Sequence, residues 1–587
     1  MASAATRRES ERKWYGWGYK DSYFYVGQDS VPYFAGDRYE ICGEPLPRLM
    51  QYMADVRADV NHRTPPQNLE VILSTIGEPQ RNEGFISFLE KQNIQCSFDK
   101  LHRLNRCHGE SIYEMYALRH GKFPRTPDVI VWPKSHDEIV SIVAAADANK
   151  VVIIPIGGGT SMSLNLQCPE NESRMIVSLD MEKMNKVLKI DKRNYTVQVE
   201  AGIIGMDLEK ELNENGFTLG HEPDSLEFST AGGWVATRAS GMKRGKYGNI
   251  EEILVHATVV TPKGILEKSS QAPRVSTGPD THHLILGSEG MLGVITRVTL
   301  KIFDKPEREQ YGCIVFPTFE HGIGFMREVV RKRCNAASMR LVDNYQFRIS
   351  RCYKKGHITA WRKLWERIED SFLYSWKGYD RNGICAMTLK LEGTAKEVKA
   401  HEKLLFSIAA KYNGMNGYPE NGRYGYILAN AIGYFRDLNM DFNLIGDSVE
   451  TSTPWDKIMP ACSAVSNLLQ EEFGKLDLPY SLSFRLSQAY DAGVCIYIYY
   501  SFNYRNLSSK EYPPDVVLRI SKMIREAIMA LGGSLSHHHG VGKLKPKHMP
   551  DFLSESGVSA LRAVKQALDP NNVFGSGNWF AKPKSML

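Results

Sequence analysis

The sequence lacks the features that identify several large classes of protein. Its ten cysteines are scattered and no C-x-x-C pair occurs, so neither a zinc site nor a disulfide framework is indicated, and a reducing compartment is expected. No run approaches the roughly 18 apolar residues of a membrane span. No apolar stretch follows the start MASAATRRESERK, so we expect no signal peptide.

Charge of one sign is not concentrated anywhere in the chain. The 73 Lys and Arg residues exceed the 67 Asp and Glu residues by six, and no basic run is dense enough to predict nucleic-acid binding. What is present is enough for a large globular protein, because 587 residues with 42% hydrophobic side chains suffice for three or four domains of about 150 residues. The slight basic excess suits a phosphorylated substrate or an anionic lipid surface.

A glycine-rich loop follows an expected strand, helix and strand. Residues 128–133 and 151–155 have the composition of short buried strands, and Ser135-His136-Asp137-Glu138 has the pattern of a helix capping box between them. The loop, PIGGGTS, has three adjacent glycines that allow positive φ and expose consecutive backbone N–H groups, which favours a pyrophosphate site. It is neither a Walker A loop nor G-x-G-x-x-G, whose third glycine is replaced by Met162. A flexible glycine turn is the alternative.

Three later segments share the small residues of this loop: PDSLEFSTAGG (223–233), TRASG (237–241) and GSEGMLGVITRVTLKI (287–302). Glycine, serine and threonine beside a strand or helix start let the backbone approach a large flat ligand closely. The segments alternate with β-branched strands such as TVQVEAGI, which linkers do not do. The four segments are therefore predicted to form one composite ligand site.

The stretch CIYIYYSFNYR (495–505) is predicted to be a strand with two different faces. Alternation places Val494, Ile496, Ile498, Tyr500 and Phe502 on one face, and Cys495, Tyr497, Tyr499, Ser501 and Asn503 on the other. The second face is polar, and a tyrosine on it can exchange a proton with a carbon acid if its neighbours lower its pKa.

Three consecutive histidines stand in GGSLSHHHGVGK (532–543), directly after a predicted helix that begins at Pro513 and Pro514 and ends at Gly532 and Gly533. Taken alone, they are compatible with proton chemistry, metal ligation, anion binding or an exposed turn.

These motifs together resemble the flavin domain of the vanillyl-alcohol oxidase superfamily. More narrowly, the chain from KWYGWGYKDS (13–22) to DPNNVFG (569–575) is similar to the alkyldihydroxyacetonephosphate synthases, on GHEPDSLEFST, GYFRDLN, QAYDAG, FNYR and GSLSHHHGVGK. The resemblance implies an α+β fold with an FAD domain of two α+β subdomains, a cap domain of antiparallel sheet and helices, and a mostly helical N-terminal region. The expected division is 1–124 (accessory region), 125–305 (FAD-binding domain), 306–559 (cap and substrate domain) and 560–587 (a C-terminal segment near the flavin that carries a targeting signal).

The resemblance also implies a function. The chain is expected to be an FAD-dependent transferase of ether-lipid, and hence plasmalogen, biosynthesis. It would exchange the acyl chain of 1-acyl-dihydroxyacetone phosphate for a long-chain fatty alcohol and give 1-alkyl-dihydroxyacetone phosphate and a fatty acid, without net redox change. The FAD is expected to be non-covalent, because no histidine stands at the family's flavin-linking positions.

Location and partners are expected from the same resemblance. The terminal Ser585-Met586-Leu587 is one substitution from the Ser-Lys-Leu address, which predicts a peroxisomal protein, peripheral to the luminal face of the membrane. A homodimer and an association with dihydroxyacetone-phosphate acyltransferase are expected, and nucleic-acid binding is not.

The family pattern places site residues on this chain. The catalytic set is Tyr499, His537, His538, His539 and His221, and the substrate-binding set is Arg436 and Arg340. The FAD-contacting set is Pro155, Ile156, Gly157, Gly158, Gly159, Thr160, Ser161, Pro223, Asp224, Ser225, Leu226, Glu227, Phe228, Ser229, Thr230, Thr237, Arg238, Ala239, Ser240, Glu289, Gly290, Met291, Leu292, Gly293, Val294 and Ile295.

Alternatives remain for several of these residues. Tyr497 and Tyr499 could simply line a channel, Arg436 could pair with Asp437 or Asp441, and His221 could act by positioning FAD. No metal is expected, because consecutive residues of an extended segment point to opposite sides. Two other functions stay open: a flavin dehydrogenase or oxidase of the same superfamily, and a non-enzymatic lipid or metal binder.

Overall fold

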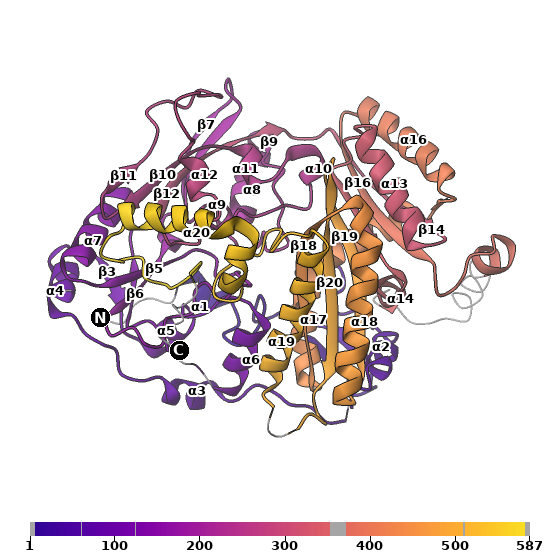
Figure 1. Ribbon diagram of the computed structural model, residues 1–587, viewed down its shortest axis with the longest axis horizontal. Coiled ribbons are helices and arrows are strands. Elements are labelled where there is room, and N and C mark those ends of the chain that lie inside the picture. The colour runs from indigo at the N-terminus through magenta and orange to yellow at the C-terminus, as the bar shows by residue number, and fades with distance from the viewer. Residues whose placement is uncertain are drawn as a thin grey trace.

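The computed structural model describes residues 6–59, 61–121, 123, 125–352, 371–508 and 511–580. Two sheet-containing halves lie side by side, one built around β3–β12 and the other around β14–β20 (Figure 1). The long helix α20 (Met549–Leu568) returns from the second half and lies over the first. The mixture of helices with parallel and antiparallel sheets confirms the predicted α+β class.

The first subdomain contains the strand, helix and strand predicted before the glycine loop. Its sheet has the order β3-β4-β6-β5, in which β4 and β5 both pair with β6 in parallel. The strands are β3 (Gln95–Ser97), β4 (Val129–Trp132), β5 (Val152–Ile156) and β6 (Ile176–Asp180). Helix α7 (His136–Ala148) begins as predicted, because Ser135 Oγ accepts the amide of Glu138 at 3.2 Å, although the Glu138 carboxylate accepts from Lys134 N. Helix α4 (Glu83–Lys91) packs against α7.

The second subdomain is an antiparallel sheet of order β11-β10-β12-β8-β7. Its strands are β7 (Val187–Asp191), β8 (Thr196–Glu200), β10 (Leu254–Thr261), β11 (Gly264–Leu266) and β12 (Val294–Lys301). Its helices are α8 (Gly205–Glu214), α9 (Ala231–Thr237), α10 (Arg244–Tyr247), α11 (Ile250–Ile253) and α12 (His282–Ile285). One hydrophobic core joins this sheet to the first one, so the two α+β subdomains form a single body.

The second half is built on an antiparallel sheet of order β17-β14-β16-β15-β19-β20-β18. Its strands are β14 (Arg308–Phe316), β15 (Ser338–Val342), β16 (Cys385–Gly393), β17 (Met415–Asn416), β18 (Leu444–Pro454), β19 (Tyr480–Ala489) and β20 (Gly493–Asn503). Side chains from α13 (Phe319–Arg331), α16 (Ala395–Lys411), α18 (Ile458–Leu476) and α19 (Pro513–Ala530) share one core with this sheet. The predicted apolar face of β20 is confirmed, because Val494, Ile496, Ile498, Tyr500 and Phe502 all belong to that core.

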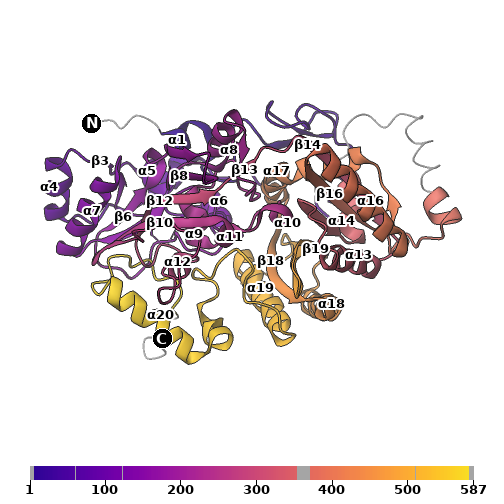
Figure 2. The ribbon, with the colours of Figure 1, turned by 90° about the horizontal axis from the view of Figure 1, so that it is seen from above.

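The N-terminal region binds both halves together. It contains α1 (Arg7–Glu11), β1 (Phe24–Val26), β2 (Pro32–Phe34), α2 (Leu49–Asp55), α3 (Leu69–Thr75), α5 (Lys100–Leu104) and α6 (Ile112–His120). Residues of β1, β2 and α2 share a core with α17 (Pro419–Asp441). Helix α1, at the start of the region, lies beside the first half, on the side opposite α20 (Figure 2). Because β3 pairs with β4, the sheet continues across the predicted boundary at residue 124, and the four-part division of the chain stays a prediction.

Short elements complete the chain. They are β9 (Phe217–Thr218), β13 (Phe303–Asp304), α14 (Asn344–Cys352), a π-helical turn (Ser371–Trp376) and 3-10 turns at Met181–Lys183, Trp455–Lys457 and Pro546–His548. Among the helices within the described ranges, none combines the length and the apolar character needed to cross a bilayer. The predicted terminal signal, Ser585 to Leu587, lies outside the described residues.

Candidate active site

A cavity of about 340 Å³ lies where the two halves meet, a volume in the usual range of small-molecule sites. All four predicted small-residue segments line it, together with side chains from β15, β18, β19, β20 and the histidine loop (residues 536–540). Trp17, from the N-terminal region, also lines it. The composite ligand site predicted from the sequence is therefore one space in the fold.

The glycine loop has the geometry of an anion cradle. The N–H groups of residues 157–160 have no hydrogen-bond partner in the described part of the chain, and Gly159 has a φ of +70°. A Cβ at Gly157 would overlap Thr230 Oγ1, and a Cβ at Gly158 would overlap the carbonyl oxygen of Phe228. From the other side Arg12 Nη1 donates to the Gly158 carbonyl at 2.6 Å. The loop thus keeps free N–H donors, and nothing larger than glycine fits at its centre.

Most of the predicted FAD-contacting residues line the cavity, and some do not. The predicted residues that line it are Pro155, Ile156, Gly157, Gly158, Gly159, Thr160, Ser161, Pro223, Asp224, Ser225, Ser229, Thr230, Thr237, Ala239, Ser240, Glu289, Gly290, Gly293, Val294 and Ile295. The predicted residues outside the lining are Leu226, Glu227, Phe228, Arg238, Met291 and Leu292. Of this second group, Phe228, Met291 and Leu292 are buried apolar residues.

An arginine pair faces the cavity around one carboxylate. Arg340 Nη2 lies 3.0 Å from Asp224 Oδ1, and Arg485 Nη2 lies 4.0 Å from Asp224 Oδ2. Burial raises the pKa of Asp224, but the two guanidinium groups lower it below its ordinary value. Two cations against one carboxylate leave a positive site, and Arg485 Nε is buried without a hydrogen-bond partner among the described residues. Arg485, which the sequence analysis did not single out, is thus a second anion-binding candidate beside Arg340.

Arg436 is placed elsewhere. It does not line the cavity, and its guanidinium binds the carboxylate of Glu110 at 2.9 Å and the Glu110 carbonyl. Glu110 also faces Arg12 at 3.6 Å. The structural ion pair considered for Arg436 therefore exists, but with Glu110 rather than with Asp437 or Asp441.

The three histidines are held by one buried carboxylate. Glu450 of β18 accepts the Ser536 hydroxyl at 2.5 Å, the backbone amides of His538 (3.2 Å) and His539 (3.0 Å), and the amide of His537. Burial raises the pKa of Glu450, but the Lys545 ammonium group contributes most to lowering it well below its ordinary value. The loop is therefore fixed against the sheet.

His538 and His539 line the cavity, whereas His537 lies behind them. Burial lowers the pKa of His537 to about 3 and those of His538 and His539 to about 4, so all three are neutral near pH 7. The histidines can therefore donate at one ring nitrogen and accept at the other.

Two stacked tyrosines of β20 form the wall next to the histidines. The rings of Tyr497 and Tyr499 are 5.6 Å apart and nearly parallel, and both line the cavity, as the predicted second face of β20 requires. Tyr497 Oη lies 2.7 Å from His538 Nε2. The Tyr499 hydroxyl has no hydrogen-bond partner among the residues that the structure describes. Burial raises the pKa of Tyr499 to about 12, although Arg485 opposes the shift.

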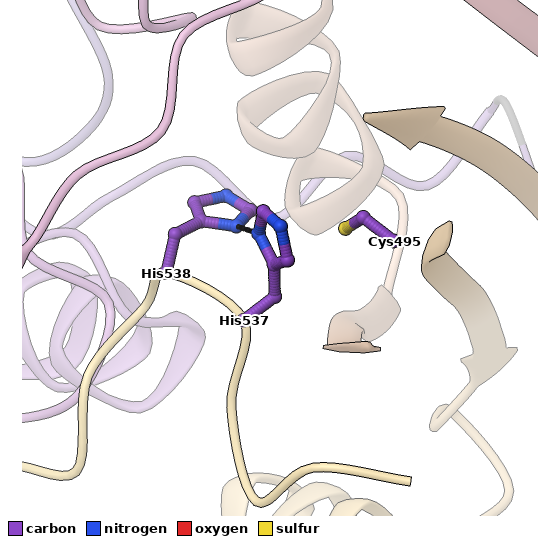
Figure 3. A group of neighbouring side chains, drawn as sticks. All are labelled: Cys495, His537 and His538. Atoms are coloured by element: carbon purple, nitrogen blue, oxygen red, sulfur yellow. Dashed lines mark hydrogen bonds between the residues drawn. The ribbon is translucent and has the colours of Figure 1, made fainter. Parts of the chain in front are cut away.

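Cys495, His537 and His538 bring one sulfur and two ring nitrogens within 4.8 Å of one another (Figure 3). Sequence spacing could not show this, because the cysteine comes from β20. However, His537 Nδ1 and His538 Nδ1 are hydrogen-bonded to each other at 2.8 Å, and both Nε2 atoms are bound to tyrosines. Burial raises the pKa of the Cys495 thiol far above its ordinary value. The group is therefore engaged in hydrogen bonds, and the expectation of no metal stays a prediction.

His221 lies outside the cavity lining, with its ring 4.9 Å from that of Trp234, which lines it. Both of its ring nitrogens are buried without a hydrogen-bond partner in the described ranges, and burial lowers its pKa to about 3. A buried polar ring without partners beside the cavity, together with the free N–H cradle, fits a site that an additional polar group completes.

Comparisons with known proteins identify that group. Residues 127–270 match the family of FAD binding domains, and residues 305–579 match the C-terminal domain family of FAD linked oxidases. The predicted cofactor, FAD, is thereby confirmed.

Full-length relatives cover nearly the whole chain. Alkyldihydroxyacetonephosphate synthase of Caenorhabditis elegans is 46% identical over 574 residues, covering 97% of this chain and 95% of the relative. The synthase of Dictyostelium discoideum is 31% identical and covers 96% and 92%. A crystal structure of an alkyldihydroxyacetonephosphate synthase is similar with a TM-score of 0.82 and 28% identity, covering 98% of this chain and 99% of that one.

Proposed function

The chain belongs to the alkyldihydroxyacetonephosphate synthases, FAD enzymes of ether-lipid synthesis, and from this premise we propose its reaction in detail. It exchanges the acyl chain of 1-acyl-dihydroxyacetone phosphate for a long-chain fatty alcohol. The bond between C1 and the ester oxygen breaks, a bond between C1 and the alcohol oxygen forms, and a fatty carboxylate and the proton of the alcohol leave. No electron acceptor is consumed.

One observation carries the proposal. A single cavity joins the glycine cradle, a positive arginine pair and a tyrosine–histidine wall. The N–H groups of residues 157–160 would hold the FAD pyrophosphate, and the flavin, when bound, would supply covalent catalysis for the exchange. A flavin dehydrogenase needs the glycine cradle for its cofactor. An enzyme that acts on a phosphorylated substrate also needs the positive arginine pair.

Arg340 and Arg485 are proposed to hold the substrate phosphate. Both line the cavity, and their shared Asp224 balances only one of the two charges. A planar guanidinium binds two phosphate oxygens at once, which fixes C1 relative to the flavin. Arg436, which the family pattern assigned to the substrate, is proposed to act indirectly, because it is bound to Glu110 outside the cavity.

Tyr499 is proposed to move the proton at C1. Its hydroxyl has no hydrogen-bond partner among the described residues, whereas the Tyr497 hydroxyl lies 2.7 Å from His538 Nε2. The Arg485 guanidinium lies 5.0 Å from the Tyr499 ring centre and stabilises negative charge that develops on its oxygen. The neutral histidines of the loop stabilise charge and accept or donate protons beside it.

An anaerobic exchange assay tests the reaction. The purified yellow protein is mixed with palmitoyl-dihydroxyacetone phosphate and radiolabelled hexadecanol without an electron acceptor, and ether lipid is extracted. We expect label in the alkyl product, lost in Tyr499→Phe and retained in Tyr15→Phe, a tyrosine that does not line the cavity. Absence of label in the wild type, with flavin bleached by hydroxy acids instead, would identify a flavin dehydrogenase.

Location and assembly are proposed from the sequence. Ser585-Met586-Leu587 is proposed to direct the chain into the peroxisome, where it associates with the luminal membrane face as a homodimer, together with dihydroxyacetone-phosphate acyltransferase. Removing the last three residues from a fluorescent fusion should leave the protein in the cytosol. Continued peroxisomal fluorescence would contradict this.

A further inference from the structure

A continuous chain of hydrogen bonds leads from the cavity to a tyrosine outside it. Tyr497 Oη lies 2.7 Å from His538 Nε2, His538 Nδ1 lies 2.8 Å from His537 Nδ1, and His537 Nε2 lies 2.6 Å from Tyr490 Oη. Tyr497 lines the cavity, whereas Tyr490, directly after β19, does not and is half-buried. His537 and His538 thus connect Tyr490 at the outer end of the chain of hydrogen bonds with Tyr497 at the cavity.

The partners of Tyr490 give this chain a direction. Ser240 Oγ donates to Asn249 Oδ1 at 2.7 Å, which leaves the Asn249 amide nitrogen to donate to Tyr490 Oη at 3.0 Å. A phenol oxygen that accepts from Asn249 is free to donate its own proton to His537 Nε2.

The direction propagates through the two rings, since a neutral imidazole carries one hydrogen. His537, which accepts at Nε2, must carry its hydrogen at Nδ1 and donate it to His538 Nδ1. His538 then carries its hydrogen at Nε2 and donates to Tyr497. The Tyr497 hydroxyl is left to donate into the cavity.

The surroundings favour a neutral chain. Several charged or titratable groups face the chain. Among the described residues they are Glu450 at the histidine backbone, Lys545 beside Glu450, Arg244 over the Tyr490 ring, Arg485 over the Tyr497 ring, Asp224, Glu251, Cys495, Tyr499 and His539. Burial lowers the pKa of His537 and His538, and it raises that of Tyr497 well above its ordinary value. A phenolate left on Tyr497 would be costly, so a proton that it gives away must be replaced through His538.

We infer that Tyr490, His537, His538 and Tyr497 form a proton relay that exchanges protons between solvent and the reacting groups. The inference rests on the proposed function, in which a carboxylate departs and an alcohol loses its proton. Tyr490 acts through His537, and Asn249, which donates to Tyr490, is a positioning residue; neither lines the cavity.

Each half of the exchange reverses the relay once. When the acyl chain departs, Tyr497 gives its proton to the carboxyl oxygen and takes the Nε2 proton of His538. His538 then takes the Nδ1 proton of His537, and His537 takes the hydroxyl proton of Tyr490. Water reprotonates Tyr490. When the alcohol adds, its proton passes to Tyr497, and each member hands its own proton outward until one reaches water. The chain then has its first direction again, and the fatty acid ionises in solution.

Removing one hydroxyl tests the relay. Tyr490→Phe keeps the ring but breaks the chain at its outer end, so kcat of the alkyl exchange should fall by about 10²-fold, the lower end of what positioned proton transfer contributes, with KM unchanged. Small proton carriers such as imidazole should restore the rate as their concentration rises. Tyr500→Phe is the matched control, because Tyr500 Oη binds Val517 O and Ser521 on the opposite face of β20. A Tyr490→Phe enzyme with wild-type kcat, or one that imidazole does not rescue, would overturn the relay.

A second measurement does not depend on activity. Nitrogen-15 NMR of labelled histidines should show His537 with its proton on Nδ1 and His538 with its proton on Nε2, and Tyr490→Phe should perturb both signals, as Tyr500→Phe does not. The same tautomer on both rings would refute the relay. If the wild type makes no ether lipid but the two tautomers differ as stated, the proposed reaction fails and the directed chain stands.

Discussion

Replacing Glu450 by glutamine should release the histidine loop from the sheet. One carboxylate oxygen accepts from Ser536 and His539, and the other accepts from His537 and His538. A glutamine side chain keeps one acceptor oxygen, so its NH₂ group faces one pair of donors. Two hydrogen bonds to a charged group are then lost at about 1.5–3 kcal/mol each, and the free energy of unfolding should fall by about 3 kcal/mol or more.

Activity should fall further than this loss of stability explains. The loop carries His538 and His539 into the cavity, so a loosened loop misplaces them, and kcat/KM should drop about 10²-fold. Urea unfolding and the anaerobic exchange assay measure the two effects. Glu392→Gln is the control, because Glu392 is equally buried and accepts from Tyr247 at 2.6 Å beside Lys243 and Lys390, away from the histidines. Wild-type stability of Glu450→Gln, or equal loss of activity in both variants, would refute the reasoning.

Three other predictions concern the cradle, the arginines and pH. Gly158→Ala should yield colourless protein, because its Cβ would overlap the Phe228 carbonyl; a flavin spectrum at full occupancy would contradict the cradle. Arg485→Lys should raise KM for acyl-dihydroxyacetone phosphate by about tenfold, since lysine cannot bind phosphate bidentately. Arg436→Lys should mainly lower the melting temperature. A raised KM in Arg436→Lys and only a lowered melting temperature in Arg485→Lys would make Arg436 the phosphate-binding residue. Burial lowers the pKa of His221 to about 3, below the unfolded value of about 6.5. Between these two pH values the unfolded chain binds more protons than the folded chain, so the free energy of unfolding falls as the pH falls from about 6.5 toward about 3. Between pH 7 and pH 5 the free energy of unfolding should fall by about 2 kcal/mol because of this residue. Urea titrations of His221→Phe at both pH values should not show this fall. The same pH dependence in the variant and the wild type would refute the buried neutral state.

Local patterns in the sequence were sufficient for the parts of the site that are made by the backbone. The glycine loop, the three small-residue segments and the two faces of β20 follow from glycine conformation and strand alternation, which depend only on neighbouring residues. For the same reason α7 and α19 begin close to their predicted positions. These local rules decide which residues can face a ligand.

The residues that the sequence analysis missed depend on strand register. Tyr497 pairs across the sheet with Glu450 on one side and Arg485 on the other, although they are 47 and 12 positions away along the chain. No local pattern fixes that register, so the anchor of the histidines and the second arginine could not be found. Arg485 carried a weak signal, because it stands in a strand-like stretch, FRLSQ, close to QAYDAG.

Arg436 shows the opposite case. Its family motif was present, but its partner, Glu110, comes from a region that the sequence analysis treated as accessory. The N-terminal residues Arg12 and Trp17 likewise reach the loop and the cavity. A contact between segments more than 300 residues apart is set by tertiary packing, which motif matching does not include.

An oxygen label tests the central claim, that C1 exchanges its oxygen substituent in this cavity. Hexadecanol carrying oxygen-18 is incubated anaerobically with the holoenzyme and unlabelled palmitoyl-dihydroxyacetone phosphate, and the lipids are analysed by mass spectrometry. The account predicts oxygen-18 in the ether product and palmitate that retains both of its unlabelled oxygens. Oxygen-18 in a hexadecyl palmitate ester, with none in an ether lipid, would show attack at the acyl carbon and contradict it.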